Sequence, residues 1–555
     1  MWCSMNKKLI RWDFWTGVTL LAILVFGLFL IYPLFSLFIT AFQDPETGAF
    51  TLGHFTHFFQ RKYYYESMIN SFTVTTCVTV LAIIIGTILA YFMSMYKVKF
   101  KSAVEVCIII SLLSPPFIGA YSWILIGGRS GVLTQWLQNS FGIEAPSIYG
   151  FSGILLVLTL KLYPFIYLYV SGALKSIDSA LIEAAESLGC SGIKKVFTVI
   201  VPLITPTILA GALMVFMNAM ADFGTPMLIG EGFNVMPVMI YSEFINEVGD
   251  QANFAAAMAA IMVFITSVIF LLQKYVVNRK SFTMSSLRPI QVGELHGVEN
   301  MLMHAGIYLL VALSLIPQIM VIYTSFLKTS GAIFVDGYSL DSYRTIFNTL
   351  GSAIQNTYMF STCAMLMIIF LGMTVAYLTT RRKSWLTEVI DTLTMFPYII
   401  PGSVLGITLL LAFNDEPLLL SGTAFIIIIS LVIRRLPYTL RSSSAILYQI
   451  SPSMEEASIS LGASPLKTFF KITAVMMLPG VMSGAILSWI TAINELSSSV
   501  ILFTGATKTM SVAIYTEVIR ASYGTAAALS TILTLTTITA MVIFFKVSGR
   551  KDVTL

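Results

Sequence analysis

Residues 183–189 read Glu-Ala-Ala-Glu-Ser-Leu-Gly, and residues 456–462 read Glu-Ala-Ser-Ile-Ser-Leu-Gly. The two segments begin 273 residues apart, and the prolines that follow them, Pro206 and Pro479, keep the same separation. Lysines lie between each segment and its proline, and long hydrophobic runs lie on either side. A separation that stays constant over acidic, apolar and proline positions indicates that the chain holds two copies of one unit.

The composition predicts that most of the chain lies in a membrane. Of its 555 residues, 57% are hydrophobic and 11% are charged, whereas a soluble protein has about 25% charged residues. The five cysteines form no Cys-x-x-Cys pair, so we interpret them as small packing residues. The first hydrophobic run, residues 14–42, is too long for the apolar core of a signal peptide, and we expect it to span the bilayer.

Twelve hydrophobic runs reach the roughly 20 residues that a transmembrane helix needs. They form two series of six, separated by a polar segment. We therefore predict a first repeat at residues 1–280, a cytoplasmic linker at 281–300 and a second repeat at 301–555. The runs lie near residues 14–42, 68–95, 104–127, 151–174, 203–221, 254–276, 301–327, 353–380, 388–413, 422–447, 474–494 and 524–547.

Residues inside and between the runs also recur. Gly86 has its counterpart in Gly372, and Ile-Tyr-Ser-Glu at residues 240–243 is matched by Ile-Tyr-Thr-Glu at 514–517. Because each repeat has an even number of spans, both repeats enter the membrane from the same side and are parallel. The sequence thus predicts an all-α polytopic membrane protein with twelve transmembrane helices in two parallel six-helix repeats.

Prolines predict breaks in two of these spans. Pro115 and Pro116 lie in the third run, and Pro397 and Pro401 lie in the ninth. Proline removes a helical hydrogen bond and bends the helix that contains it. Such bends are tolerated in a membrane where neighbouring helices or a cavity satisfy the freed carbonyls.

The lysines and arginines predict the orientation. With a cytoplasmic N-terminus, most of the 32 basic residues fall in segments on the cytoplasmic side, as the positive-inside rule requires. This orientation places both termini, the linker, and the segments 177–200 and 450–473 in the cytoplasm. These two segments are named the first and second coupling loops from here on.

The first coupling loop is expected to form a helix–turn–helix. Ala184, Ala185 and Leu188 form an apolar stripe, and Gly189 permits a sharp turn. Small residues allow another protein to approach the backbone closely. The alternative is a plain amphipathic helix at the membrane interface, which does not explain why the pattern occurs twice at equivalent positions.

This pattern resembles the EAA loop of bacterial ABC importer permeases. It consists of Glu-Ala-Ala, three residues, Gly, and then an apolar–Pro pair about ten residues further on. The first copy matches and ends in Val201-Pro202, whereas the second has Ser458 for the second alanine and Val475 where proline is expected. The resemblance covers nearly the whole chain and is nearest to ferric iron permeases, with sulfate, molybdate, thiamine, polyamine and aminoethylphosphonate permeases as relatives. It implies the type I ABC importer permease fold in the bacterial inner (cytoplasmic) membrane. The positions to which it assigns coupling to an ATPase are Glu183, Ala184, Ala185, Gly189, Glu456, Ala457 and Gly462.

The resemblance also implies partners. A homodimeric cytoplasmic ATPase would hold ATP and magnesium and drive alternating access, and an extracytoplasmic binding protein would deliver ferric iron. The chain itself has no Gly-x-x-x-x-Gly-Lys-Ser/Thr phosphate-binding motif. We expect no enzyme activity, cofactor, resident metal or nucleic-acid partner for it. His54 and His57 in the outer loop are interpreted as ordinary surface residues.

Four charged residues are candidates for the translocation pathway. Lys161 and Arg434, 273 residues apart, lie inside spans, where a basic residue costs roughly 2.5–3.5 kcal/mol. They would suit an anionic substrate or a ferric ion with anionic ligands, and the alternative is that they snorkel or bond to carbonyls. Asp222 and Glu495, also 273 apart, follow the fifth span of each repeat and could line a gate, pair with the basic residues or cap a helix. Asp222-Phe223-Gly224 further resembles a segment near the pathway of molybdate and iron permeases.

Two other functions stay open. The same machinery could import another small solute, such as aminoethylphosphonate, thiamine or a polyamine. A secondary transporter of two parallel six-span halves, driven by an ion gradient, would need a relay of buried acids and no docking loop. Acids within the spans are few, and the loops are present, so the importer is the favoured interpretation.

Overall fold

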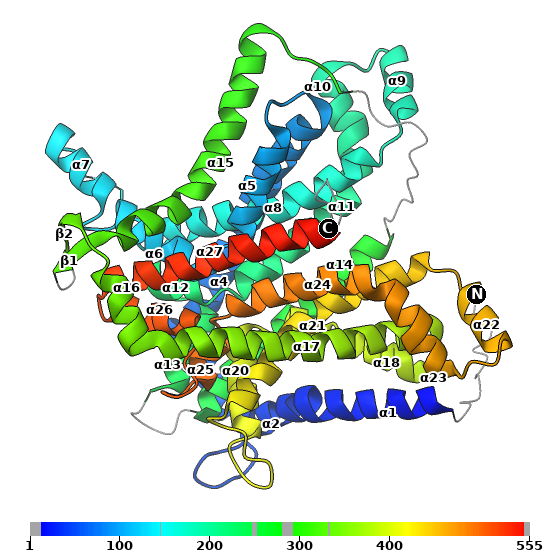
Figure 1. The fold of residues 1–555 in the computed structure, drawn as a ribbon. Helices are drawn as coiled ribbons and strands as arrows, with labels where there is room; N and C mark the ends of the chain where they lie inside the picture. The colour runs from blue at the N-terminus through cyan, green and yellow to red at the C-terminus, as the bar shows by residue number, and fades with distance from the viewer. Residues whose placement is uncertain (1–12, 145, 247–251, 280–291, 331–332, 549–555) are drawn as a thin grey trace. The chain divides into compact units, whose positions relative to one another are not determined.

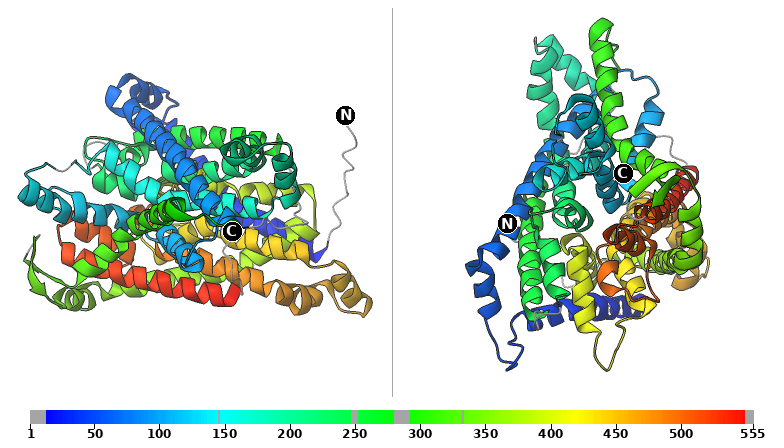
Figure 2. Two further views of the ribbon diagram at one scale, coloured as in Figure 1. Left: turned by 90° about the horizontal axis from the view of Figure 1, so that it is seen from above. Right: turned by 90° about the vertical axis from the view of Figure 1, so that its left-hand side faces the viewer.

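The computed structural model describes most of the chain, and the described part is almost entirely helical (Figures 1 and 2). Within it, the one sheet has two antiparallel strands, β1 (Leu327–Ser330) and β2 (Ile333–Tyr338). The predicted linker lies mostly outside the described residues, and so do both ends of the chain. The described ranges are 13–144, 146–246, 252–279, 292–330 and 333–548.

The helices of the first repeat follow the predicted runs, with short helices between them, and η denotes a π-helical turn. They are α1 (Phe14–Phe26), η1 (Gly27–Ile31), α2 (Tyr32–Ala41), α3 (Gly53–Gln60), α4 (Lys62–Met95), α5 (Lys101–Leu113), α6 (Pro116–Gly127), α7 (Val132–Phe141), α8 (Phe151–Lys175), α9 (Ser179–Ser187), α10 (Gly192–Lys195), η2 (Val196–Ile200), α11 (Val201–Met220), α12 (Gly224–Ile229), α13 (Met236–Phe244) and α14 (Ala252–Arg279).

The second repeat has a similar order of long and short helices, without a counterpart of α7 and with two strands after its first helix. They are α15 (Gly297–Ser325), α16 (Asp341–Thr345), η3 (Ile346–Leu350), α17 (Gly351–Arg381), α18 (Trp385–Leu393), α19 (Phe396–Ile399), α20 (Gly402–Ala412), α21 (Ala424–Gln449), α22 (Ser453–Ser460), α23 (Pro465–Thr468), η4 (Phe469–Thr473), α24 (Ala474–Ile493), α25 (Ser499–Leu502), α26 (Met510–Ile519) and α27 (Tyr523–Ser548).

Among the described residues, nine helices or joined helices are long and apolar enough to cross a membrane. They correspond to nine of the twelve predicted runs, and the other three are interrupted or charged. The third run bends by 99° between α5 and the helices after it, and α6 has Pro115 as its N-cap. The ninth run is split into α18, α19 and α20, with Pro401 before α20. The tenth run is α21, which carries three arginines. The predicted proline breaks are thus confirmed.

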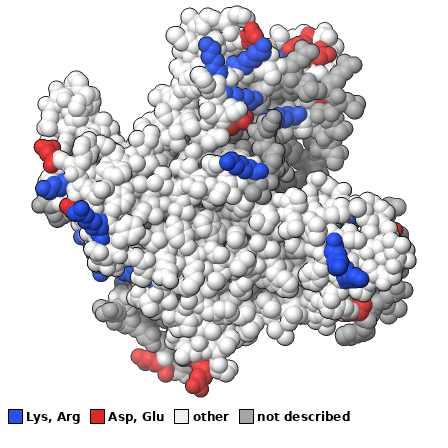
Figure 3. All heavy atoms as spheres, in the orientation of Figure 1, with Lys and Arg blue, Asp and Glu red and all other residues white. Residues whose placement is uncertain are grey.

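The long helices expose apolar side chains. Leu24 on α1 is 63% exposed and Phe264 on α14 is 68% exposed, and Figure 3 shows few acidic or basic side chains on the visible face. Large apolar surfaces that water would penalise are favourable against lipid chains. The described part of the chain therefore has the surface of a multi-pass membrane protein.

The chain forms two compact units whose limits differ from those of the sequence repeats. Unit 1 comprises Met1–Thr51, Asn348–Ala513 and Leu535–Arg550, and unit 2 comprises Leu52–Phe347, Ile514–Thr534 and Lys551–Leu555. Within unit 1, α1 packs on α18 and α2 packs on α20; within unit 2, α15 packs on α5 and α6. The first span of each repeat therefore packs with helices of the other repeat. The boundaries of the repeats themselves stay a prediction.

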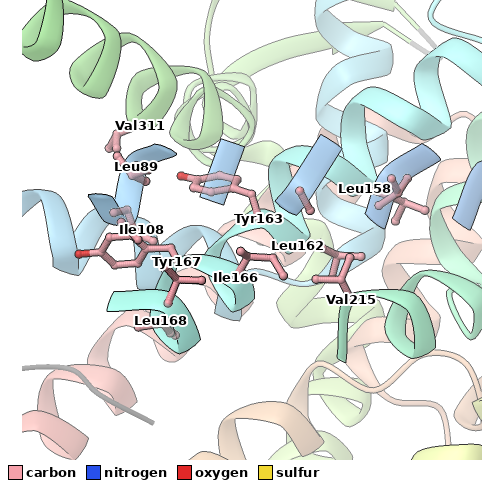
Figure 4. Packing of buried hydrophobic residues seen from close by; sticks show 14 of the residues in the cluster. Leu89, Ile108, Leu158, Leu162, Tyr163, Ile166, Tyr167, Leu168, Val215 and Val311 are labelled. Atoms are coloured by element: carbon pink, nitrogen blue, oxygen red, sulfur yellow. The ribbon is translucent and has the colours of Figure 1, made fainter. Parts of the chain in front are cut away.

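Unit 2 has its core where α4, α8 and α11 meet (Figure 4). Leu162 and Ile166 on α8, Val215 on α11 and Leu89 on α4 are buried in one cluster. Unlike an amphipathic surface helix, α8 buries side chains on most of its circumference, which is typical of a helix inside a bundle. The central position of α8 keeps Lys161 away from the lipid-facing surface.

Glycines set how closely these helices approach one another. A Cβ on Gly86 of α4 would lie 2.6 Å from Cβ of Ile166 and 2.8 Å from the carbonyl oxygen of Tyr163 on α8. In unit 1, a Cβ on Gly484 of α24 would lie 2.7 Å from Cα of Thr439 on α21. Small residues at such crossings allow the close backbone contact on which helix association in membranes depends.

We expect Gly86→Ala to destabilise the protein by about 1–3 kcal/mol, the usual cost of overpacking. The measurement is the thermal unfolding midpoint of the purified protein in detergent. Gly306→Ala is the matched control, because a Cβ at this position of α15 meets no atom within 4 Å. Equal midpoints for the two variants would contradict the role assigned to Gly86.

Candidate functional site

The first coupling loop forms the predicted helix–turn–helix. The carboxylate of Asp178 accepts a hydrogen bond from the backbone N–H of Ala180 at 2.9 Å and so caps the N-terminus of α9. The helix ends at Ser187 with Leu188 as its C-cap, and Gly189 follows with φ +79°. The N–H of Cys190 then donates to the carbonyl of Ala185 at 2.9 Å, which is the pattern of a helix ended by a left-handed residue. α10 begins two residues later.

The second coupling loop repeats the turn, although the N-cap of α22, Pro452, makes no side-chain hydrogen bond. Leu461 is the C-cap of α22, Gly462 has φ +86°, and the N–H of Ala463 donates to the carbonyl of Ser458 at 3.1 Å. α23 follows after the turn. A side chain other than glycine in this backbone conformation costs roughly 1–2 kcal/mol, which explains why both copies have glycine at the turn.

Each turn presents one leucine to the surroundings. Leu188 is 88% exposed and Leu461 is 90% exposed. In the sequence, Leu188 forms part of an apolar stripe, and this pattern does not predict its exposure. The available signal was the Leu-Gly pair itself, because the residue before a left-handed glycine lies at the end of the helix and projects from it. Each of these leucine side chains is therefore available for contact with another surface.

The two coupling loops close by different contacts. In the first, Lys195 of α10 forms an ion pair with Glu186 of α9. In the second, Ser458 and Thr468 are buried and their hydroxyls lie 3.0 Å apart. Ser458 is the residue that departs from the Glu-Ala-Ala pattern, and its hydroxyl has a partner. The second loop has Ile459 and Thr468 at the positions of Glu186 and Lys195, so a buried hydrogen bond between Ser458 and Thr468 stands there in place of the ion pair.

The second coupling loop is also anchored to its own unit. Glu455 of α22 lies 3.4 Å from Nε of Arg381 on α17, and Tyr377 of α17 donates to its other carboxylate oxygen at 3.2 Å. At the equivalent place the first loop has Ile182, which packs on the core of unit 2. One loop is thus held by charges and the other by apolar contact.

Each coupling loop ends in a π-helical turn. η2 and η4 begin 273 residues apart, at Val196 and Phe469, and each leads directly into the fifth long helix of its repeat. Pro202 follows η2, whereas Val475 stands in the second repeat where proline is expected, so the turn does not require proline. Single π-helical turns occur frequently at functional sites.

The charged pathway candidates form two ion pairs, one inside each unit. In unit 2, Nζ of Lys161 on α8 lies 3.0 Å from Oδ2 of Asp222, after the end of α11. In unit 1, Nη1 of Arg434 on α21 lies 2.7 Å from Oε1 of Glu495, after α24. The carboxylates are almost fully buried, with side chains 4% and 3% exposed. Of the arrangements considered for these acids, the structure shows pairing with the basic residues.

The same carboxylates also accept backbone hydrogen bonds close to the starts of two short helices, α12 and α25. Asp222 accepts from the N–H of Thr225 at 2.9 Å, and Glu495 accepts from the N–H of Ser498 at 3.2 Å. Backbone hydrogen bonding and ion pairing therefore occur together, because one carboxylate has enough lone pairs for both. Each acid joins the fourth span of its repeat to the short helix that follows the fifth.

The two ion pairs differ by one positive charge. Arg435 also pairs with Glu495, whereas the equivalent residue in the first repeat, 273 positions earlier, is Leu162. Glycine at 402, the first residue of α20, leaves room for the guanidinium of Arg434, which a side chain there would strike. Unit 1 thus holds two arginines against one carboxylate, and unit 2 holds a balanced pair.

The outer-loop histidines lie among aromatic rings. His57 of α3 packs against Phe254 and Tyr64, with ring centroids 4.9 and 5.4 Å away. Burial, followed by the charges of Arg61 and His54, lowers the pKa of His57 below its ordinary value. Within the described part of the chain, no three His, Cys, Asp or Glu side chains are grouped as metal ligands.

Comparison with known proteins extends this description. The model of the family "Binding-protein-dependent transport system inner membrane component" matches residues 82–282 and 368–551. The ferric transport system permease protein FbpB of Actinobacillus pleuropneumoniae is 28% identical over 550 residues, which cover 97% of this chain and 79% of that protein. The putative ferric transport system permease protein FbpB 1 of Haemophilus influenzae is 27% identical over 503 residues, 88% of this chain and 77% of that protein.

A third relative is matched over about half of the chain. The putative 2-aminoethylphosphonate transport system permease protein PhnU of Salmonella choleraesuis is 24% identical over 264 residues, which cover 47% of this chain and 91% of that protein. The family model, for its part, matches once in each predicted repeat and over more than half of the chain in total. This protein therefore belongs to the family of inner-membrane components of binding-protein-dependent transport systems.

Proposed function

We propose that this protein is the fused permease of an ATP-driven importer that takes up ferric iron delivered by an extracytoplasmic binding protein. The observation that supports the proposal most is the duplicated coupling loop, with the same turn and the same exposed leucine in both copies. Relatives named as ferric transport system permeases align over nearly the whole chain. The choice of ferric iron as the proposed substrate rests on their names.

The proposed arrangement follows from the basic residues. Both coupling loops and both termini lie in the cytoplasm, where most lysines and arginines fall under this orientation. A homodimeric ATPase, with ATP and magnesium bound to its own subunits, presents one groove to each loop. Glu183, Ala184, Ala185 and Gly189 of the first loop, and Glu456, Ala457 and Gly462 of the second, line these contacts.

Movement passes from loop to pathway along a continuous helical rod. The joined helix Gly192–Met220 has 29 residues, or about 43 Å at 1.5 Å per residue. It begins at the first coupling loop and ends two residues before Asp222, which pairs with Lys161. The second repeat has the same order, from Pro465–Ile493 to Glu495. A displacement of either loop by the ATPase is therefore transmitted to a buried ion pair.

The ion pairs also bear on the substrate. Asp222 and Glu495 are already neutralised by Lys161, Arg434 and Arg435, so neither carboxylate is available to attract a bare trivalent cation. Ferric iron that passes these pairs travels with anionic ligands. The extra charge of Arg435 equally favours an anionic solute, and aminoethylphosphonate, named for a relative that matches about half of the chain, is the second candidate.

The test is uptake into proteoliposomes that contain the permease with its ATPase, with binding protein outside. We expect radiolabelled ferric iron to accumulate only with ATP inside, and a protonophore to leave the initial rate unchanged. Uptake of labelled aminoethylphosphonate in place of iron would select the second candidate. Accumulation driven by a proton gradient without ATP would refute the importer and support a secondary transporter.

A further inference from the structure

A pair of tyrosines from equivalent positions of the two repeats meet inside unit 2. Tyr241 lies on α13 and Tyr515 lies on α26, in the matching segments 240–243 and 514–517. The two phenol groups lie close enough for their side chains to interact by hydrogen bonding. Their residues are 7% and 5% exposed, so the contact is closed to solvent.

The equivalent positions of the two tyrosines in the repeats indicate where their contact lies. When two parallel repeats are related by an approximate two-fold axis, a residue that touches its own counterpart has to lie next to that axis. Substrate sites of transporters built from repeats lie at the interface of the repeats. A contact between two counterpart tyrosines therefore points to a place where the path of a substrate could be closed.

A third ring connects this contact to the ion pair of unit 2. Phe223 is fully buried, and its ring centroid lies 4.9 Å from that of Tyr241 and 6.3 Å from that of Tyr515. It directly follows Asp222, the partner of Lys161. The helical rod that begins at the first coupling loop thus ends against the tyrosines.

The two helices that carry these tyrosines, α13 and α26, also have buried carboxylates. Glu243 is 8% exposed and lies near the phenol of Tyr64, and Glu517 is 9% exposed and lies 3.5 Å from Arg520. Phenol and carboxylate oxygens are hard donors, which suit hard cations rather than soft ones. Both carboxylates already have partners, so the oxygen donors that these two helices can offer to a cation are the two phenols.

We propose that Tyr241 and Tyr515 form the closed gate of the translocation pathway and that, when the gate opens, their phenol oxygens contact a hard, oxygen-liganded cation in transit. The proposal deepens the proposed function and rests on it for the substrate. Opening separates the phenols and leaves two hydroxyl groups that need new partners. The passing cation and its ligands supply them, which lowers the cost of opening only when substrate is present.

The test of the gate uses proteoliposomes of the permease–ATPase complex loaded with calcein, whose fluorescence ferric iron quenches. Without ATP or binding protein, we expect the double variant Tyr241→Ala/Tyr515→Ala to admit ferric citrate roughly tenfold faster than the unaltered complex, because the constriction is lost. Tyr163→Ala is the control, since it removes another buried tyrosine of unit 2 without touching the gate. A leak no faster than that of the control overturns the gate.

The double variant Tyr241→Phe/Tyr515→Phe keeps the rings and tests the oxygens. We expect ATP-driven iron uptake to fall about fivefold, the effect of losing one hydrogen bond. Unchanged uptake would refute the contact of the phenol oxygens with the passing cation, and this result does not depend on whether the alanine variant folds. If the alanine variant leaks but the unaltered complex does not accumulate iron with ATP, the gate is supported and ferric iron is refuted as the substrate. If the unaltered complex accumulates iron with ATP but the alanine variant does not leak, ferric iron is supported as the substrate and the gate is refuted.

Discussion

Replacing Glu495 with alanine is expected to remove most of the folded protein from the membrane. The substitution leaves Arg434 and Arg435 buried without their carboxylate and the N–H of Ser498 without its acceptor. Removing one partner of a buried ion pair typically costs about 3–5 kcal/mol, and two cations lose their partner here. Against a total stability of about 5–15 kcal/mol, this loss is large. The measurement is the yield of monodisperse protein after detergent extraction.

Two further variants separate charge from packing. Arg435→Leu restores the balanced pair that the first repeat has with Leu162, and we expect a near-normal yield. Added to Glu495→Ala, the same change should recover part of the lost protein, since one unpaired cation remains instead of two. A normal yield for Glu495→Ala alone, or no rescue by Arg435→Leu, would show that charge balance does not hold this site together.

Introducing aspartate at both Leu188 and Leu461 is expected to abolish transport without affecting the fold. Both side chains are about nine-tenths exposed, so they contribute almost nothing to the core. If each leucine enters a groove of the ATPase, its loss costs at least about 2 kcal/mol, or roughly thirtyfold in affinity per loop. The measurements are co-purification of the ATPase and ATP-driven uptake.

The control for this experiment is Phe100→Asp. Phe100 is 80% exposed and precedes α5, outside both coupling loops, so the change also replaces an exposed apolar residue by a charge. ATPase binding should be retained in this variant. If the double leucine variant still binds the ATPase and transports at the normal rate, the loops are not the coupling surface. The single variants then show whether the loop anchored by Glu455 transmits more force than its counterpart.

Much of the fold and of the coupling surface could be predicted because it depends on local properties of the chain. The number of hydrophobic runs, the proline breaks and the left-handed turns at Gly189 and Gly462 each depend on a few consecutive residues. Lys161 and Asp222 could be singled out for a related reason, since a charge in an apolar run is unfavourable wherever the run packs. Their partners could be given only as alternatives.

The sequence by itself determined the duplication, the membrane-spanning helices and the two helix–turn–helix loops, because hydrophobicity, proline and glycine act within one or two helical turns. Only the tertiary structure decided that Asp222 pairs with Lys161, that Arg435 leaves one unit with a surplus charge, and that Ser458 finds a partner in Thr468. The same holds for the exchange of first spans between repeats and for the contact of Tyr241 with Tyr515. These features join residues 10 to several hundred positions apart, and which distant side chains meet depends on how the helices pack rather than on any local pattern.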